Sequence, residues 1–287
     1  MPDPVLSIAI VNWNTRDLLV QALTSIFAGT TLPVEVIVVD NASTDASADA
    51  VAAGFPQVQL IPNADNVGYA QGNNQALTAA HGAYILLLNP DVIIPAGGLE
   101  RAVQFMEAHP EAGALGVRQV HPDGSLQRSV RGFPSPVSVL WELLGLSRLF
   151  PGSKRFGAYR MTWFNYDCEL AVDQPMGTFL MLSACALARV GLLDEAFPIF
   201  FNEVDWCLRC RQAGMQIYFT PDVEIVHYGG ASTAQVGAAM AWESRNGLLK
   251  FYAKHYPEPL YWPIRVTIAT ISWPYAWMQA LRRRRAQ

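Results

Sequence analysis

Three widespread catalytic motifs are missing from this sequence. It has no G-x-x-x-x-G-K-[ST] segment, which excludes a P-loop NTPase, and no G-x-G-x-x-G after its first apolar run, which excludes a classical dinucleotide-binding domain. The G-x-S-x-G nucleophile elbow is also missing, which argues against an α/β-hydrolase. Any enzymatic chemistry must therefore depend on other residues.

Cysteines and charges are scarce. The four cysteines are too few and too irregularly spaced for a disulfide framework, and helix packing explains the one C-x-x-C, Cys207 and Cys210, better than a zinc or redox site does. Charged residues make up 15% of the chain, below the roughly 25% that is usual. The net charge of −4 gives no argument for nucleic-acid binding. No signal peptide is recognisable, so we expect a cytoplasmic, reducing compartment.

Apolar runs and helical patterns alternate along the first part of the chain. Five runs are typical of buried strands: Leu6–Val11, Val34–Val39, Gln57–Ile61, Tyr84–Leu88 and Ala114–Val120. Between most of them lie segments with apolar residues three and four positions apart. We therefore predict an α/β fold, a doubly wound and mostly parallel sheet flanked by helices. Further on, we expect a helix at Asp205–Gly214 and two strands, Gln216–Phe219 and Val223–Val226.

Polar residues directly follow three of the predicted strands. They are Asn12 and Asn14, Asp40 and Asn41, and Asn89 and Asp91. In open α/β sheets, ligands bind beyond the carboxyl ends of the strands. The sequence therefore predicts one shared site at this edge of the sheet.

Asn89-Pro90-Asp91 follows the most apolar strand of the set. A carboxylate fixed at the mouth of a buried strand is well placed to hold a hard divalent cation, which in turn binds a diphosphate. The alternative is a turn that only caps the next helix. From the residues alone, both interpretations stay open.

Glu203, Asp205 and His227 are the other candidates for chemistry. Glu203 and Asp205 follow the apolar run Phe197–Phe201, and a carboxylate shielded by aromatic rings can have a pKa that suits a general base. The alternative is that both acids complement the N-terminal dipole of a helix. His227 ends an apolar strand before Gly229, and it is either a metal ligand or a core histidine.

Six segments in order resemble the inverting family-2 glycosyltransferases, most closely their bacterial rhamnosyltransferase-like branch. They are SIAIVNWNTRDLL (7–19), VEVIVVDNASTD (34–45), NADNVGYAQGNNQAL (63–77), ILLLNPDV (85–92), GTFLMLSACALARVGLLDEAFPIFFNEVDWCLRCRQAG (177–214) and VEIVHYGGAST (223–233). The resemblance implies a GT-A fold and a nucleotide-diphospho-sugar donor. It also implies a division of the chain into a donor-binding half (1–120), an acceptor and catalytic half (121–235) and a C-terminal helical tail (236–287).

The resemblance assigns candidate roles to individual residues. The implied donor-binding residues are Asn12, Asn14, Asp40, Asn66, Gly68, Gly72, Asn89, Asp91 and Gly177. The metal-binding D-x-D motif of the family corresponds to Asn89-Pro90-Asp91, so Asp91 is the expected ligand of Mg²⁺ or Mn²⁺, completed by His227. Asn89 stands where the family has its first acid. The catalytic base falls on Glu203, which stands where the family has an aspartate, with Asp205 as the alternative.

These assignments imply an inverting, metal-dependent transfer of a sugar to a saccharide in cell-envelope polysaccharide synthesis. We expect rhamnose from dTDP-rhamnose and an acceptor linked to polyprenyl diphosphate. Two alternatives are a UDP-sugar-dependent hexosyl or galactofuranosyl transferase and a non-catalytic sugar-nucleotide or glycan-binding homologue. Candidate acceptor contacts are Arg128, Arg131 and Trp206, and candidate diphosphate contacts are these two arginines with Lys154 and Arg155.

The C-terminal tail is aromatic and basic. From Lys250 onward the sequence has seven basic residues and one acid, Glu258. The segment Tyr261–Leu281 is interrupted by Pro263, Arg265 and Pro274, so it is poorly suited to span a membrane. We expect an interfacial helix on an anionic membrane surface. The alternative is a helix that packs on the domain.

Overall fold

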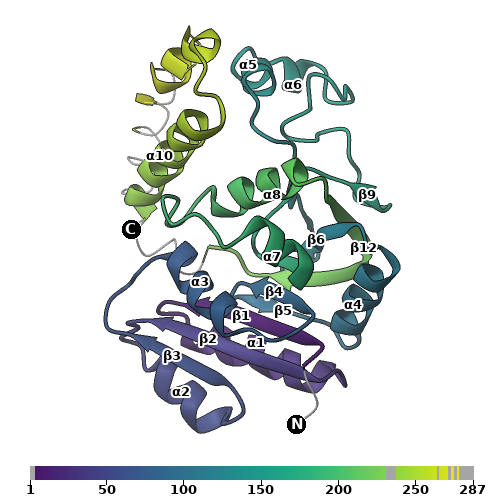
Figure 1. Cartoon of the computed structure of the whole chain (residues 1–287), viewed down its shortest axis with the longest axis vertical. Coiled ribbons are helices and arrows are strands. Elements are labelled where there is room, and N and C mark those ends of the chain that lie inside the picture. The colour runs from purple at the N-terminus through teal and green to yellow at the C-terminus, as the bar shows by residue number, and fades with distance from the viewer. Residues whose placement is uncertain (1–3, 231–236, 264, 271–272, 275–276, 278–287) are drawn as a thin grey trace.

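The computed structural model describes residues 4–230, 237–263, 265–270, 273–274 and 277. A mixed sheet forms its centre, with helices on both faces (Figure 1). The strands on the main path are β3 (Gln59–Asn63), β2 (Val34–Asn41), β1 (Leu6–Asn12), β4 (Tyr84–Leu88), β11 (Phe179–Ser183), β6 (Ala112–Val120), β12 (Gln216–His227) and β5 (Val92–Ile93), in this spatial order. The short strands are β7 (Leu126–Gln127), β8 (Val130–Arg131), β9 (Leu170–Ala171) and β10 (Gln174–Pro175).

The helices follow the predicted alternation. They are α1 (Arg16–Gly29), α2 (Ser47–Gly54), α3 (Tyr69–Ala79), α4 (Gly98–Ala108), α5 (Pro136–Leu143), α6 (Leu146–Leu149), α7 (Ala184–Val190), α8 (Asn202–Gln212) and α10 (Gly237–His255), with a 3₁₀ turn η1 (Pro259–Tyr261). The predicted α/β fold, a mostly parallel sheet flanked by helices, is confirmed.

Two details of the sheet differ from the prediction. Strand β11 runs antiparallel to both neighbours, β4 and β6, because the chain leaves the carboxyl end of β6, crosses residues 121–178 and returns at the same edge. The two strands expected at Gln216–Phe219 and Val223–Val226 are one strand, β12, with a register shift between Thr220 and Glu224. Pro221 lies in this shift and has no N–H to donate to a ladder.

Neighbouring residues of β1 face opposite sides of the sheet and enter separate cores. Ile8 and Ile10 pack in the core beneath α1 and α4, whereas Ala9 and Val11 pack in the core of α3 and α8. This alternation is that of a strand buried on both faces. A third apolar cluster, described below, joins α8 to α10.

The parallel pairing brings the predicted strand ends together. Asn12 lies opposite Asp40 in the β1–β2 pair, and Ile10 lies opposite Leu88 in the β1–β4 pair. The polar residues after β2, β1 and β4 therefore meet at one edge, as the sequence predicts.

Within the C-terminal tail, the described residues that follow α10 pack back on this helix. Arg245 Nη2 donates to the backbone oxygen of Ala269 at 3.0 Å, and the rings of Trp242 and Trp273 lie 6.3 Å apart. Among the described residues, no helix is long and apolar enough to cross a membrane. The four arginines at 282–285 lie outside the described residues.

Candidate active site

Three of the implied donor-binding residues form one hydrogen-bonded cluster. Asn12 Nδ2 donates to Asp40 Oδ1 at 2.8 Å and to Ser43 Oγ at 3.1 Å, and the same hydroxyl accepts from the backbone N–H of Asn14 at 2.9 Å. Asn14 has a left-handed backbone, φ 52°, which asparagine tolerates better than most residues. The loops after β1 and β2 are therefore tied into one wall. Ser43, which is not among the residues predicted for the site, bridges these two loops.

A surface hollow of about 500 Å³ lies beside this wall and includes Asn14 in its lining. Asp17 and Asp45 also line it. Two carboxylates would repel a diphosphate, so a ligand part bound in this hollow would have to be uncharged, such as a base or a ribose.

Asn66 and Gly68 build the turn that begins α3. Asn66 Oδ1 accepts from the Gly68 N–H at 3.0 Å, and Gly68 has φ 87°. A Cβ on Gly68 would lie 3.1 Å from the backbone oxygen of Pro198, which also accepts from the N–H groups of Tyr69 and Ala70 at 2.8 and 3.0 Å. These residues therefore tie α3 to the loop that leads into α8.

Gly72 is a packing residue. It is buried, and a Cβ there would lie 2.9 Å from a methyl group of Val11, so α3 can approach β1 closely only with glycine at this position. Gly72 faces no open surface, and its expected role as a donor contact is corrected.

Asp91 and His227 meet across β5 and β12. His227 lies opposite Val92 in this pair, and the N–H of Tyr228 donates to the backbone oxygen of Asp91 at 3.0 Å. His227 Nε2 lies 3.3 Å from Asp91 Oδ1, and both residues are about 5% exposed or less. Neither atom has a hydrogen-bond partner in the described structure. Buried atoms without partners are costly, so this pair is a candidate ligand site.

Gln127 orients the histidine. Its Oε1 lies 2.7 Å from His227 Nδ1, and a proton on Nδ1 that is donated to this amide leaves the lone pair of Nε2 directed at Asp91. An outer hydrogen bond of this kind is typical of metal-ligating histidines. Adjacent ligands of an octahedral ion with bonds of about 2.1 Å are roughly 3 Å apart, which the observed separation fits. No sequence pattern points to Gln127, because it is 100 residues from His227 in the chain.

The metal set provided by the chain is small. Among the described residues, no group of three or more His, Cys, Asp and Glu side chains is close enough to hold an ion. Mg²⁺ and related ions usually take one or two carboxylates and complete their shell with water and substrate phosphates. Asp91 and His227 therefore fit a cation that is shared with a diphosphate.

Glu203 lies in the first turn of α8, next to Gly177. Phe201, the residue before the helix, has φ 74°, which is strained for a bulky side chain and is often found at functional sites. A Cβ on Gly177 would be 3.7 Å from Glu203 Cβ and Cγ. Burial raises the pKa of Glu203 to about 7. The carboxylate thus combines a fixed position with a pKa suited to a general base.

Tyr69 is influenced by the charges of both carboxylates of the site. Its hydroxyl donates to the backbone oxygen of Gly177 at 3.0 Å. Burial raises the pKa of Tyr69, and the charges of Glu203 and, more weakly, Asp91 raise it further. Both acids therefore lie within electrostatic reach of one hydroxyl. Tyr69 could not be predicted as a site residue, because a tyrosine at a helix start carries no catalytic signature in the sequence.

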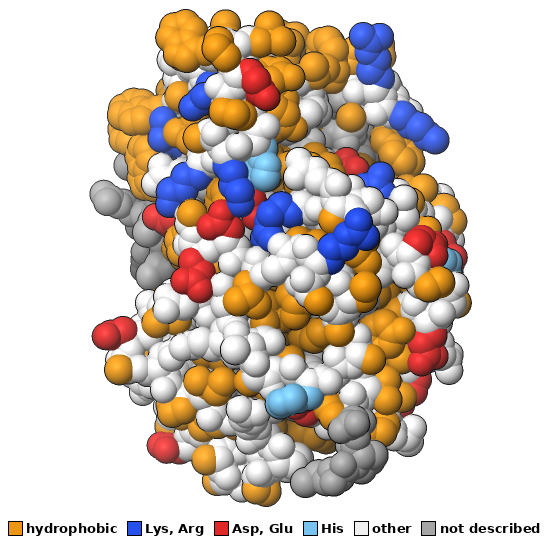
Figure 2. Space-filling view, viewed as in Figure 1, with side chains coloured by type: hydrophobic (Ala, Val, Ile, Leu, Met, Phe, Trp, Pro, Cys, Tyr) orange, Lys and Arg blue, Asp and Glu red, His pale blue; other side chains and the backbone are white. Residues whose placement is uncertain are grey.

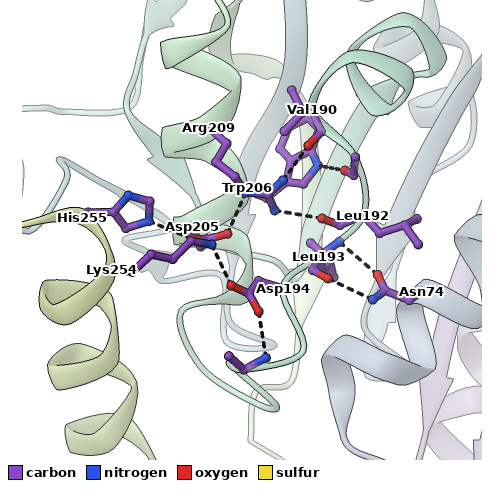
Figure 3. A network of polar contacts seen from close by, with 12 residues as sticks. Asn74, Val190, Leu192, Leu193, Asp194, Asp205, Trp206, Arg209, Lys254 and His255 are labelled. Atoms are coloured by element: carbon purple, nitrogen blue, oxygen red, sulfur yellow. Dashed lines mark hydrogen bonds and ion pairs between the residues drawn. The ribbon is translucent and has the colours of Figure 1, made fainter.

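Asp205 belongs to a separate, buried ion cluster (Figure 3). It is fully buried, and its carboxylate lies 2.8 Å from Arg209 Nε, 2.6 Å from Lys254 Nζ and 2.7 Å from His255 Nε2. Burial would raise the pKa of Asp205, but hydrogen bonds from these three partners outweigh it and hold the pKa at about 2. A carboxylate held this way takes no proton near neutral pH. The alternative assignment of Asp205 as the base is therefore corrected.

The three expected acceptor contacts lie in different surroundings in the structure. Trp206 is fully buried and its Nε1 donates to the backbone oxygen of Gly191 at 2.8 Å, so its expected contact with an acceptor is corrected. Arg128 Nη1 donates to the backbone oxygen of Phe164 at 3.1 Å. Arg131 lies in β8, opposite Gln174 of β10, which is three residues before Gly177.

Lys154 and Arg155 stack on aromatic rings. Lys154 Nζ lies 4.9 Å from the ring centre of Trp163, and the guanidinium of Arg155 lies 5.8 Å from that of Trp141. Such cation–π contacts stabilise the segment that carries them.

The family model of glycosyl transferase family 2 matches residues 7–168. The chain belongs to this family. One curated relative is the N-acetylglucosaminyl-diphospho-decaprenol L-rhamnosyltransferase of Mycobacterium tuberculosis, 28% identical over 92% of this chain and 91% of the relative. Another is the rhamnosyltransferase WbbL of Escherichia coli, 24% identical over 56% of this chain and 61% of the relative.

The fold also matches solved glycosyltransferase structures. The mannosyltransferase PcManGT of Pyrobaculum calidifontis, solved with GDP-Man and Mn²⁺, superposes with a TM-score of 0.59 at 20% identity, over 99% of this chain and 75% of that chain. The family and these neighbours establish a family-2 glycosyltransferase with the GT-A fold that the sequence resemblance implies.

Proposed function

We propose that this enzyme transfers rhamnose from dTDP-rhamnose to a saccharide linked to a polyprenyl diphosphate, with inversion at the anomeric carbon. The observation that carries the inverting chemistry is the carboxylate of Glu203, beside Gly177 and with a pKa of about 7. The donor sugar and the acceptor are supported by the activities named for the two rhamnosyltransferase relatives. Synthesis of a cell-envelope polysaccharide follows as the proposed role.

Glu203 is the proposed general base. Its carboxylate takes the proton of the acceptor hydroxyl while the oxygen attacks the anomeric carbon from the face opposite the leaving group. One displacement inverts the configuration, so no second carboxylate is needed as a nucleophile. The Tyr69–Gly177 hydrogen bond keeps the floor of the site in place beside this carboxylate.

Asp91 and His227 are the proposed ligands of Mg²⁺ or Mn²⁺. When bound, the cation offsets the charge that develops on the departing nucleoside diphosphate. Asn89, at the end of β4, supplies a neutral oxygen in place of a carboxylate, so Asp91 is the principal acid of this set. The buried, unpartnered Asp91 Oδ1 and His227 Nε2 support the assignment.

The remaining donor contacts are assigned to the cluster at the strand ends. Asn12, Asn14 and Asp40 bind the base and ribose, and Asn66 and Gly68 hold the start of α3 in place. Arg131 is the preferred acceptor contact because its strand, β8, pairs with the strand that leads to Gly177, and Arg128 is the second. In this proposal residues 1–120 bind the donor and residues 121–235 bind the acceptor.

We also propose contact with the cytoplasmic face of a membrane through the tail (236–287). Trp262, Trp273 and Trp277 are 64%, 53% and 51% exposed, and aromatic side chains at such positions favour the membrane interface. A lipid-linked acceptor would make this contact useful.

A donor panel tests the proposed function. Purified enzyme is incubated with dTDP-rhamnose, UDP-glucose, UDP-galactofuranose and GDP-mannose, a lipid-linked N-acetylglucosaminyl acceptor, and Mn²⁺ or a chelator. We expect transfer from dTDP-rhamnose, abolished by the chelator, and NMR of the product should show an anomeric configuration opposite to that of the donor. A product with the configuration of the donor contradicts inversion. Transfer from one of the other donors contradicts the assignment of dTDP-rhamnose. Thermal stabilisation by nucleotides without any transfer supports a non-catalytic binding homologue.

The metal ligands give a graded prediction. We expect His227→Ala to raise the Mn²⁺ concentration needed for half-maximal activity strongly, and Gln127→Leu to raise it about 10- to 100-fold, as for other outer-shell partners of metal ligands. Initial rates over a Mn²⁺ titration measure both effects. Gln75→Leu is the matched control, because Gln75 hydrogen-bonds to Asn63 of β3, at the opposite edge of the sheet from β12 and β5. Equal Mn²⁺ dependence in all four proteins contradicts the metal assignment.

The pH dependence follows from the position of Glu203. Burial raises the pKa of this base to about 7, and only its deprotonated form accepts the proton. We expect kcat/KM to rise with pH through a midpoint near 7 and to fall tenfold per pH unit below it. A midpoint near pH 4.5, the ordinary value for a glutamate, contradicts the assignment.

A further inference from the structure

A third apolar cluster lies between the catalytic helix and the C-terminal segment. It joins Val139 of α5, Val204 of α8, Phe251 and Tyr252 of α10, and Ile268 of the tail. Beside it is a cavity of about 210 Å³. Its lining residues are Leu249, Tyr252, Trp262, Arg265, Val266 and Ala269. This volume is below the range of about 300–1,000 Å³ that is typical for whole small ligands, so it suits one part of a larger ligand.

The lining combines apolar walls with two polar groups. Trp262 is 64% exposed and Val266 is 43% exposed, so the cavity opens to the surface at these residues. Arg265 is the charged member of the lining. Tyr252 is 1% exposed, and in the described structure its hydroxyl has no hydrogen-bond partner, although buried hydroxyls are nearly always paired. A ligand with an aliphatic part and an anionic or hydrogen-bonding part matches this set.

The cavity is joined to the catalytic helix by the third apolar cluster. Tyr252 lines the cavity, and it packs in one cluster with Val204 of α8, the residue after Glu203. The cavity therefore lies at the end of an apolar cluster that begins beside the proposed base.

The surface around this end of the molecule is apolar and basic. Figure 1 places α5, α6 and the tail at the same end of the long axis, and in Figure 2 apolar side chains cover this end, with Lys and Arg side chains among and below them. Large exposed apolar residues at the ends of α5 and α6 include Leu144, Leu149 and Phe150, which are 58%, 70% and 51% exposed. A lipid that leaves the cavity would meet a surface suited to a bilayer.

We propose that the cavity between α10 and the residues that follow it binds the first part of the acceptor's isoprenoid chain, with Arg265 as the charged group for its diphosphate. The saccharide then extends toward Glu203. This assignment rests on the proposed function, because it takes the acceptor to be lipid-linked. It gives the C-terminal segment a role in choosing the acceptor.

Binding of farnesyl diphosphate tests the cavity without catalysis. Isothermal titration compares the wild type with Val266→Glu, which places a carboxylate at the exposed rim, and with Val137→Glu. Val137 is also an exposed valine, on α5, and it does not line the cavity. We expect Val266→Glu to weaken binding at least about tenfold, from the lost apolar contact and the added like charge, and Val137→Glu to leave it unchanged. Inorganic diphosphate should bind all three proteins alike. Equal farnesyl diphosphate affinities in all three overturn the proposal, as does displacement of farnesyl diphosphate by phosphatidylglycerol at equal concentration.

Acceptor kinetics separate this inference from the proposed function. The wild type is given the same saccharide diphosphate on a long isoprenoid chain and on a methyl group. We expect a preference in kcat/KM of at least about tenfold for the long chain in the wild type and in Val137→Glu, and loss of this preference in Val266→Glu. Transfer to both acceptors at equal rates overturns the inference and leaves the proposed function intact. If farnesyl diphosphate binds tightly and this binding depends on Val266, but no sugar is transferred, the inference stands and the proposed function is contradicted.

Discussion

The Glu203→Gln variant is expected to lose about 100- to 10,000-fold in kcat, the range that removal of a positioned general base usually costs. Glutamine keeps the shape of the side chain beside Gly177 but cannot take the proton of the acceptor. The affinity for the nucleotide donor should stay nearly unchanged, because the proposed donor contacts lie at the strand ends. Steady-state kinetics and donor titration measure the two quantities separately.

The same variant should be more stable than the wild type at alkaline pH. The pKa of Glu203 is raised from 4.5 to about 7 by burial, so the folded state holds the proton more tightly than the unfolded state does. The wild type therefore loses stability as the pH rises from about 4.5 to about 7, and glutamine avoids this loss. We expect a higher Tm for Glu203→Gln at pH 8 and equal Tm values at pH 4.

Glu107→Gln, an exposed change on α4, is the matched control for both measurements and should alter neither. Activity that survives in Glu203→Gln rules out Glu203 as the base. A gain in Tm that is the same at pH 4 and pH 8 contradicts a buried carboxyl group with a raised pKa.

The Asp205→Ala variant should lose about 3–5 kcal/mol of unfolding free energy, the usual cost of removing one partner from a buried ion pair. Arg209, Lys254 and His255 would lose their common acceptor, and two of these three lie on α10. Urea unfolding measures the change. Asp194→Ala is the control: it removes one contact of Lys254 and leaves Asp205 in place, so it should cost much less.

The contribution of Asp205 also depends on pH. Its pKa is lowered from 3.8 in the unfolded chain to about 2 in the folded one, so the contribution is complete above about pH 4 and is lost as the pH falls through about 2. The two values correspond to about 2 kcal/mol. We expect the stability difference between the wild type and Asp205→Ala to shrink over this interval. A constant difference, or a cost no larger than that of Asp194→Ala, contradicts the proposed cluster.

The C-terminal helix α10 contacts both sides of the catalytic turn. Asp205 holds it on one side, and on the other a Cβ on Gly247 would lie 2.8 Å from the ring of Phe201, so glycine lets that ring approach α10. Residues 201 and 205 enclose Glu203. The family match ends at residue 168, so these contacts around the proposed base all lie beyond the matched segment.

The sequence alone determined which edge of the sheet carries the polar residues, and which acids lie there. Continuous apolar runs predicted β1, β2 and β4, because strands buried on both faces must be apolar throughout. Polar residues directly after such runs must lie at the strand ends, which located Asn12, Asp40 and Asp91 at one edge. Site residues whose position is set by their neighbours in the chain can therefore be predicted from the sequence.

Contacts between distant segments were decided by the tertiary structure. Glu203 and Asp205 are two residues apart on a helix and so point about 200° apart, and only the packing of α8 shows which one faces Gly177 and which one faces α10. The same holds for Trp206 and Gly72, whose burial depends on what packs against them. Gln127 and His227 are 100 residues apart, and only the fold brings them together, because sheet pairing, not chain order, sets their separation.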